Sequence, residues 1–201
     1  MKTIGVTGSS GSGKTTVCKI LNKRADVEII DADSISREMQ IPGNEYYEKI
    51  KERFGDKIIL EDGNINREAL AMIIYNDDEA REDLNSLTFK YVNMGIKNKI
   101  KALNDTNLGY AVIDASLLYE SGLDKLCDYV IALISDKKLK IQRICQRDGI
   151  SPDVAMMRLN IQQDDSFYED KADILIKNKS DKDSNLEKEL KRIFSKLDKM
   201  K

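Results

Sequence analysis

The chain has 201 residues, of which 41% are hydrophobic and 34% are charged, and its formal net charge is −2. This length fits one domain with a proper core, and the near-neutral charge gives no reason to expect a nucleic acid or a membrane surface as partner. No apolar run approaches the roughly 18 residues of a membrane-spanning helix. The chain has no histidine, which excludes histidine catalysis, argues against a structural zinc site and leaves carboxylates as candidates for a general base.

The cysteines bear on the compartment. Cys18, Cys127 and Cys145 are odd in number and far apart in the sequence. No signal-peptide pattern accompanies them, so we expect reduced thiols in a cytoplasmic protein. The expected oligomeric state is a monomer or a weak homo-oligomer.

The first predicted elements are a short strand at residues 3–6 and a helical pattern from Thr16 onward. Between them, residues 8–15 read GSSGSGKT, which matches G-x-x-x-x-G-K-[ST] in the strand-to-helix context that a phosphate-binding loop requires. Lys14 is expected to neutralise phosphate charge, and the Thr15 hydroxyl to hold Mg²⁺. The alternative is a glycine-rich turn with an incidental lysine. The residues expected to bind a nucleoside triphosphate are Gly8, Ser9, Ser10, Gly11, Ser12, Gly13, Lys14, Thr15 and Thr16.

A second strand is predicted at residues 27–33, ending in Asp31 and Asp33. Alternation along a strand predicts that the two carboxylates point to the same face of the sheet. Ligands of open α/β sheets bind beyond the carboxyl ends of the strands, so both acids are expected to border the nucleotide site. The alternative is that they serve the following helix, with Asp33 or Ser34 as its cap.

About 80 residues with mainly helical patterns follow, which predicts a helical insertion before a third strand at residues 109–114. Asp114 ends that strand in the manner of a Walker-B acid, and we expect it to reach the metal, directly or through water. A solvated aspartate at a strand end is the alternative.

A fourth strand is predicted at residues 129–134, and a helix after it carries Lys140, Arg143 and Arg147 along one stripe. Such a stripe is either a solvated face or the phosphate-binding side of a kinase lid, because arginine grips phosphate oxygens with two donors. A fifth strand at residues 173–176 and an amphipathic helix at the end complete the pattern. The alternation of strand and helix predicts an α/β fold with a mostly parallel sheet.

A series of short motifs runs from Ile4 to about Asn178. Beyond the phosphate loop they are residues 30–37, 42–43, 54–55, 62–70 and 117–122, Arg143, residues 147–149, Arg158 with Gln162, and residues 172–173 with Asn178. The phosphate loop is shared by many kinases, whereas these segments together are much more specific. In this order they resemble the dephospho-coenzyme A kinase family, the P-loop enzymes of the last step of coenzyme A synthesis.

The resemblance implies a single P-loop kinase domain over residues 1–201. It has a three-layer α/β/α core with a five-stranded parallel sheet, an acceptor-binding helical insertion at about residues 35–107 and a helical lid at about 147–170. The implied reaction moves the γ-phosphoryl group of ATP, with Mg²⁺, to the ribose 3′-hydroxyl of dephospho-coenzyme A. The residues implied for catalysis are Asp33 as base with Lys14 and Arg143, for ATP binding Arg147 in addition to the loop, and for acceptor binding Asp33, Arg37, Leu117 and Glu120.

The sequence departs from the usual family pattern at four places. Phe89–Lys90 stands where the family usually has His-Pro, and Ser116 where it has proline; Ser9 replaces a common glycine and Lys140 a common glutamine. None of these changes removes a group that phosphoryl transfer needs. They bear on the identity or affinity of the acceptor more than on the ATP chemistry. Two other functions stay open: a kinase for nucleosides or nucleotides, and a non-catalytic sensor of ATP or a coenzyme A precursor.

Overall fold

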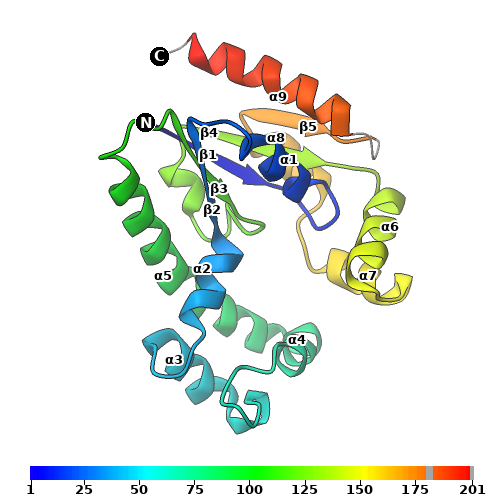
Figure 1. Cartoon of the computed structure of the whole chain (residues 1–201). Coiled ribbons are helices and arrows are strands. Elements are labelled where there is room, and N and C mark those ends of the chain that lie inside the picture. Colours follow the sequence, from blue (N-terminus) through cyan, green and yellow to red (C-terminus); the bar gives the residue numbers. More distant parts are fainter. Residues whose placement is uncertain (180–182, 200–201) are drawn as a thin grey trace. The chain divides into compact units, whose positions relative to one another are not determined.

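The computed structural model describes residues 1–179 and 183–199 of the chain. The chain forms two compact units, coloured along the sequence in Figure 1. Met1–Ile30 together with Thr106–Lys201 make up the first unit, and Asp31–Asp105 the second. The first unit holds the sheet, and the second is built from helices.

The sheet has five parallel strands in the order β2-β3-β1-β4-β5. β1 lies at its centre, with Val6 opposite both Asp114 of β3 and Ile131 of β4. The chain crosses from one side of β1 to the other, which makes the carboxyl end of β1 the topological switch point where ligands bind. The strands are β1 Lys2–Thr7, β2 Val27–Asp31, β3 Tyr110–Asp114, β4 Tyr129–Ile134 and β5 Ile174–Lys177.

Helices cover both faces of the sheet, which gives the expected three-layer α/β/α core. Because side chains alternate along a strand, Ile131 and Leu133 of β4 face one layer and Ala132 and Ile134 the other. The first layer is α1 (Lys14–Leu21) with α9 (Asp183–Asp198), which lie side by side in Figure 1. α8 (Asp165–Lys171) packs on the opposite face against β4.

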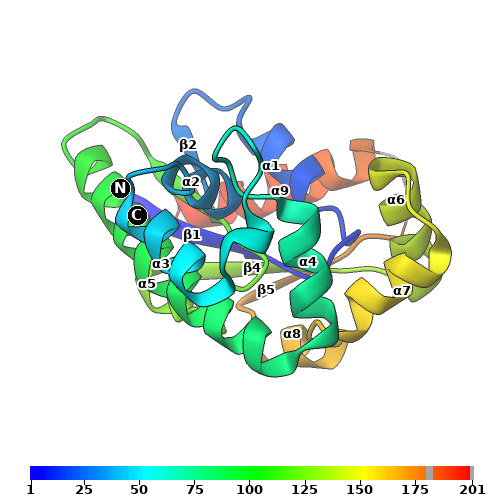
Figure 2. The same ribbon diagram turned by 90° about the horizontal axis from the view of Figure 1, so that it is seen from below.

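Two further helices of the first unit form a hairpin, drawn in yellow-green and yellow at the right of Figure 2. α6 (Lys137–Asp148) ends at Gly149, whose positive φ of 66° suits glycine, and α7 (Pro152–Asn160) begins after the Ser151 cap. Both boundaries follow from local signals, a glycine after one helix and a serine–proline pair before the next. The hairpin has a small core of its own, formed by Ile144, Ala155 and Leu159.

The second unit is a helical bundle around aromatic side chains. The rings of Tyr46 and Tyr91 stack with their centroids 5.3 Å apart, and Ile50 and Phe54 are buried beside them. Each helix begins at a polar residue whose side chain accepts a backbone N–H, as helix N-termini favour. The helices are α2 Ala32–Met39, α3 Glu45–Phe54, α4 Arg67–Asn76 and α5 Asp78–Leu103; the short 3₁₀ helices are η1 Asp56–Ile58 here and η2 Leu123–Leu126 in the first unit.

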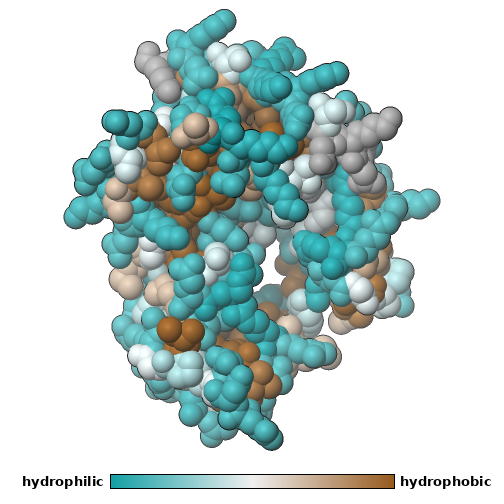
Figure 3. Space-filling view, viewed as in Figure 1, coloured by the Kyte–Doolittle hydropathy of each residue, from teal (hydrophilic) through white to brown (hydrophobic). Residues whose placement is uncertain are grey.

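The surface is mainly hydrophilic, as expected for a chain with 34% charged residues. In the face that Figure 3 shows, apolar residues form separate brown patches between hydrophilic ones. Among the helices of the described residues, none combines the length and the hydropathy needed to cross a bilayer.

Candidate active site

The phosphate loop connects β1 to α1 through three glycines with positive φ, at positions 8, 11 and 13. At Gly13 a Cβ atom would lie 2.3 Å from Nδ2 of Asn178, so the tight turn and the close neighbour both require glycine. The helix begins at Lys14, two residues earlier than the sequence pattern suggested. The Lys14 ammonium donates a hydrogen bond of 2.6 Å to the carbonyl of Gly8, which folds the side chain back over its own loop.

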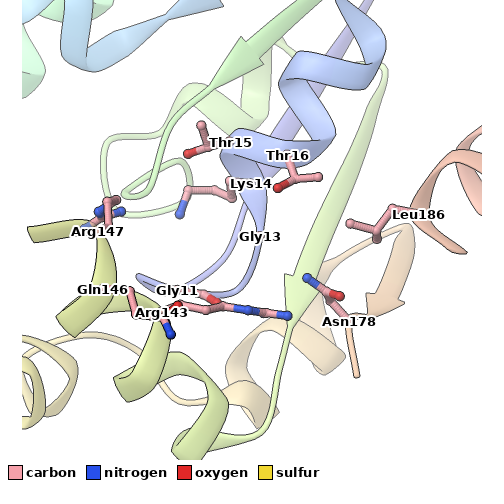
Figure 4. Close-up of a pocket in the computed structure, with 10 residues that line it drawn as sticks. All are labelled: Gly11, Gly13, Lys14, Thr15, Thr16, Arg143, Gln146, Arg147, Asn178 and Leu186. Atoms are coloured by element: carbon pink, nitrogen blue, oxygen red, sulfur yellow. The ribbon is translucent and has the colours of Figure 1, made fainter. Parts of the chain in front are cut away.

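A cavity of about 360 Å³ opens beside this loop, and Figure 4 shows the side chains that line it. Arg143 and Arg147 reach it from α6, and Lys14 from α1. Its described lining contains these three cations and no carboxylate. The positive end of the α1 helix dipole adds to the potential of these cations, so the cavity suits a polyphosphate. The lining residues are Gly11, Gly13, Lys14, Thr15, Thr16, Arg143, Gln146, Arg147, Asn178 and Leu186.

The basic stripe of α6 is divided between two tasks. Arg143 donates to the carbonyl of Gly11 at 3.0 Å and to the Ser135 hydroxyl at 3.2 Å, so it braces the loop while lining the cavity. Lys140 is buried behind the loop. The alternative of a solvated face is therefore wrong for these two residues, because α6 packs on the loop instead of standing in solvent.

Arg147 lies at the end of the stripe, in a network of charges. Its Nε donates to Asp148 at 2.7 Å, and Arg158 of α7 donates to the same carboxyl group at 2.6 Å. The hydrogen bond from Arg147 and the charges of both arginines lower the pKa of Asp148, against the effect of burial. Asp148 thus joins the two helices of the hairpin at the edge of the cavity.

Two side chains that hold the loop received no role from the sequence. Gln162, just after α7, accepts the Ser10 N–H at 2.8 Å and donates to the Ser10 hydroxyl at 3.0 Å. Asn178 donates to the carbonyl of Ser12 at 2.9 Å. Asn178 directly follows β5, at the carboxyl edge of the sheet, and that position could have indicated it. Gln162 was singled out only as part of the family motif with Arg158, which did not indicate that it contacts the loop.

The prediction for Asp31 and Asp33 needs a correction. β2 ends at Asp31 and α2 begins at Ala32, so Asp33 lies in the first turn of a helix and strand alternation does not relate the two. The cause is local: one oxygen of Asp31 accepts the N–H groups of Asp33 and Ser34, which caps the helix and ends the strand. The cap is thus Asp31, and neither Asp33 nor Ser34. The Asp31 carboxylate also faces the Arg37 guanidinium at 3.6 Å, and Asp33 is exposed.

Thr15 and Asp114 are the two residues that the sequence predicted as oxygen ligands of Mg²⁺. Asp114 ends β3 opposite Val6, next to the strand that leads into the phosphate loop, and Thr15 lines the cavity. The described residues contain no group of three or more His, Cys, Asp or Glu side chains arranged as a metal cage. A hydroxyl and one carboxylate fit a hard cation that keeps waters and binds phosphate oxygens, as Mg²⁺ does in kinases.

The segment after β3 contains Leu117 and Glu120, both predicted to bind the acceptor. Each is half-buried, and Oε2 of Glu120 is fully buried with no hydrogen-bond partner among the described residues. Burial raises the pKa of Glu120, opposed in part by its own backbone N–H, by Gln163 and by Lys171. The neighbouring Tyr119 hydroxyl is buried as well, and its pKa rises to about 12 for the same reason.

Comparison with known proteins decides the family. A family model described as dephospho-CoA kinase matches residues 2–184. A dephospho-CoA kinase of Carboxydothermus hydrogenoformans is 35% identical over 184 residues, which cover 92% of this chain and 89% of the relative. The chain belongs to the dephospho-CoA kinase family. It is therefore an ATP-dependent kinase, as its motifs indicated.

Solved structures agree with this assignment. A dephospho-CoA kinase from Campylobacter jejuni superposes with a TM-score of 0.69 at 29% identity, covering 98% of this chain and 97% of the other. TT1252 from Thermus thermophilus gives a TM-score of 0.78 at 22% identity, with 98% and 97% coverage, and shows likeness of fold. The P-loop kinase fold expected from the sequence is confirmed.

Proposed function

We propose that this enzyme transfers the γ-phosphoryl group of ATP to the ribose 3′-hydroxyl of dephospho-CoA, which yields CoA. The cavity beside the phosphate loop carries this proposal, because its described lining presents three cations and no carboxylate. A nucleoside triphosphate matches that charge. Membership of the dephospho-CoA kinase family supports dephospho-CoA as the acceptor.

The side chains divide the work of the transfer. Lys14 and Arg143 stabilise the charge that spreads over the transferring phosphoryl group, since most of the catalysis in such reactions is positioning and electrostatics. Arg147 binds ATP. The loop residues from Gly8 to Thr16 bind the phosphates of ATP. Asp33 is the base: it orients the ribose hydroxyl and accepts its proton as the hydroxyl oxygen attacks. Its exposed position on α2 leaves the carboxylate open to an incoming acceptor.

Mg²⁺ is the metal that we assign to this site. Thr15 would hold the ion through its hydroxyl, and Asp114 would act on it through water. Bound with ATP, the ion neutralises charge on the phosphate oxygens. The donor set supports this assignment, because two oxygen donors leave room for waters and for the nucleotide.

The two units take different substrates in this proposal. The helical unit Asp31–Asp105 binds the acceptor, with Arg37 close to Asp33 in sequence, and Leu117 and Glu120 contribute from the sheet unit. Residues 147–170, which include α7 and most of α8, serve as the lid over the nucleotide. A cytoplasmic location and a monomer or weak homo-oligomer remain predictions from the sequence.

An ADP-release assay with a panel of acceptors tests the proposal. With ATP and Mg²⁺, we expect turnover with dephospho-CoA and at least about a hundred-fold less with nucleosides and nucleoside monophosphates. Lys14→Ala removes the cation of the phosphate loop and should abolish turnover, so this variant is the negative control. Turnover with a nucleotide and none with dephospho-CoA would assign a different acceptor, and removal of Mg²⁺ by a chelator without loss of activity would refute the metal.

A further inference from the structure

Lys140 is a buried cation placed behind the phosphate loop. Only 7% of the residue is exposed, although lysine is rarely buried unless its charge is paired. Its ammonium donates to Oδ1 of Asp165 at 2.7 Å and to the hydroxyl oxygen of Ser9 at 3.2 Å. One nitrogen therefore joins α6, α8 and the phosphate loop.

The first half of the phosphate loop rests on α6 around this lysine. Ser9 is 3% exposed, so its hydroxyl depends on protein partners. Gly11 lies so close to the backbone of Lys140 that a Cβ atom would be 2.6 Å from its carbonyl oxygen. One turn further along α6, Arg143 donates to the carbonyl of Gly11. The second half of the loop is held separately, by Asn178 at Ser12.

Asp165, the second hydrogen-bond partner of Lys140, orients the lysine ammonium. Asp165 is the first residue of α8, and its side chain is 36% exposed, so the carboxylate stays solvated if the lysine is removed. Gln162, three residues earlier, bonds Ser10 twice. Residues 162–165 and residues 9–10 are thus tied by two neighbouring sets of hydrogen bonds. Because the Asp165 carboxylate neutralises the Lys140 ammonium, Lys140 contributes little net charge to the phosphate site. Its contribution is the position in which it holds the Ser9 side chain.

We propose that Lys140 is a positioning residue for phosphoryl transfer. Its ammonium fixes Ser9, and with it the backbone conformation of residues 9–11 that receives the phosphates of ATP, while Asp165 fixes the ammonium. A loop that is ordered before the nucleotide arrives loses less conformational entropy on binding. The inference rests on the proposed function. It predicts that loss of Lys140 lowers the affinity for ATP and leaves the affinity for the acceptor unchanged.

The test compares Lys140→Met, Ser9→Ala and the double variant with the wild-type chain. Lys138→Met, an exposed lysine in the first turn of the same helix, is the matched control. Calorimetry without acceptor gives the Kd for ATP, steady-state kinetics give kcat and both KM values, and thermal unfolding reports the fold. We expect Lys140→Met to weaken ATP binding about ten-fold, the range of a lost hydrogen bond to a charged group.

The pattern across the variants distinguishes positioning from mere stability. Ser9→Ala should reproduce most of the loss, the double variant should be no worse than Lys140→Met, and the KM for dephospho-CoA should stay within about two-fold. A folded Lys140→Met with wild-type Kd and KM for ATP, or losses that simply add, would overturn the proposal. If Lys140→Met does not fold, the ATP affinity of Ser9→Ala tests the proposal by itself. That variant lacks only the hydroxyl oxygen that accepts the hydrogen bond from Lys140. Wild-type protein that binds ATP without phosphorylating dephospho-CoA would refute the proposed function instead, and the ATP affinities would still test Lys140.

Discussion

Asp31 and Asp33 stand two residues apart and do different things. Asp31 accepts two N–H groups at the start of α2 and faces Arg37. Asp33 uses its own N–H to bond Asp31, and its side chain is exposed. In the proposed function Asp31 caps α2 and Asp33 is the base, so the two substitutions are expected to lower kcat to different extents.

Asp33→Asn tests the base. The substitution keeps size and polarity and removes the proton acceptor, so kcat should fall by at least about a hundred-fold. The Kd for ATP should change little, because the nucleotide cavity is lined by other residues. Steady-state kinetics and calorimetry measure the two effects.

Asp31→Asn is the matched control for this prediction. Asparagine caps a helix about as well as aspartate, so α2 should remain intact and kcat should fall far less than in Asp33→Asn. Equal and mild losses in the two variants would mean that neither carboxylate is the base.

Glu120 predicts a pH dependence of stability. Burial raises its pKa above the ordinary value of 4.5, so the folded protein holds this proton more tightly than the unfolded chain. The stabilisation is therefore complete below pH 4.5 and is lost as the pH rises through the raised pKa. Glu120→Gln cannot lose a proton, and its melting temperature relative to wild type should increase from about pH 4.5 toward neutrality.

Thermal melts of both proteins across this pH range check the sign. Glu28→Gln, a substitution of an exposed glutamate on β2, is the control and should follow the wild-type curve. A difference between Glu120→Gln and wild type that shrinks with rising pH would contradict the burial argument.

At the residue scale, local sequence was a good guide to the phosphate loop and a poor one to what holds it. Residues 8–15 carry the motif in one continuous stretch, so Lys14 and Thr15 could be predicted as lining residues. Lys140 and Ser9 are 131 positions apart, and Gln162 and Ser10 are 152 apart. No local pattern encodes such pairs, because only the folded chain brings them together. The end of β2 was missed because the cap of α2 overrides strand propensity.

At the scale of elements, we expect the hairpin of α6 and α7 to open at the end that carries Arg147, while the turn around Lys140 stays packed on the phosphate loop. The hairpin has its own small core, and polar contacts such as that of Arg143 with Gly11 connect it to the loop. Polar contacts of this kind exchange readily for contacts with phosphate, whereas the packing inside the hairpin need not change. The N-cap and proline of α7 were predictable because both signals are local.

Limited proteolysis tests this mobility. ATP should protect residues 140–170 from trypsin, because bound phosphates draw the basic side chains of α6 onto the nucleotide and slow the opening of the segment. Mass spectrometry of the fragments identifies the cleavage sites, and sites in α3 of the other unit are the internal control. Equal cleavage of residues 140–170 with and without ATP would mean that these helices do not close over the nucleotide.

At the scale of the whole molecule, the strands were the most predictable feature. Each buried strand is a nearly continuous apolar run, and every predicted strand lies within two residues of the observed one. The order β2-β3-β1-β4-β5 was not predictable in the same way. The order depends on which connections between strands pass across β1. It therefore depends on contacts between residues more than 100 positions apart, such as Ile4 with Tyr129.

The central claim is that this chain phosphorylates the ribose 3′-hydroxyl of dephospho-CoA with ATP. Its most direct test is to identify the product by mass spectrometry and phosphorus NMR after incubation with ATP and Mg²⁺. We predict one added phosphate per ADP released, located at the 3′ position, and no phosphorylation of an analogue that lacks the 3′-hydroxyl. Phosphate on another atom, or equal turnover of the 3′-deoxy analogue, would contradict the account.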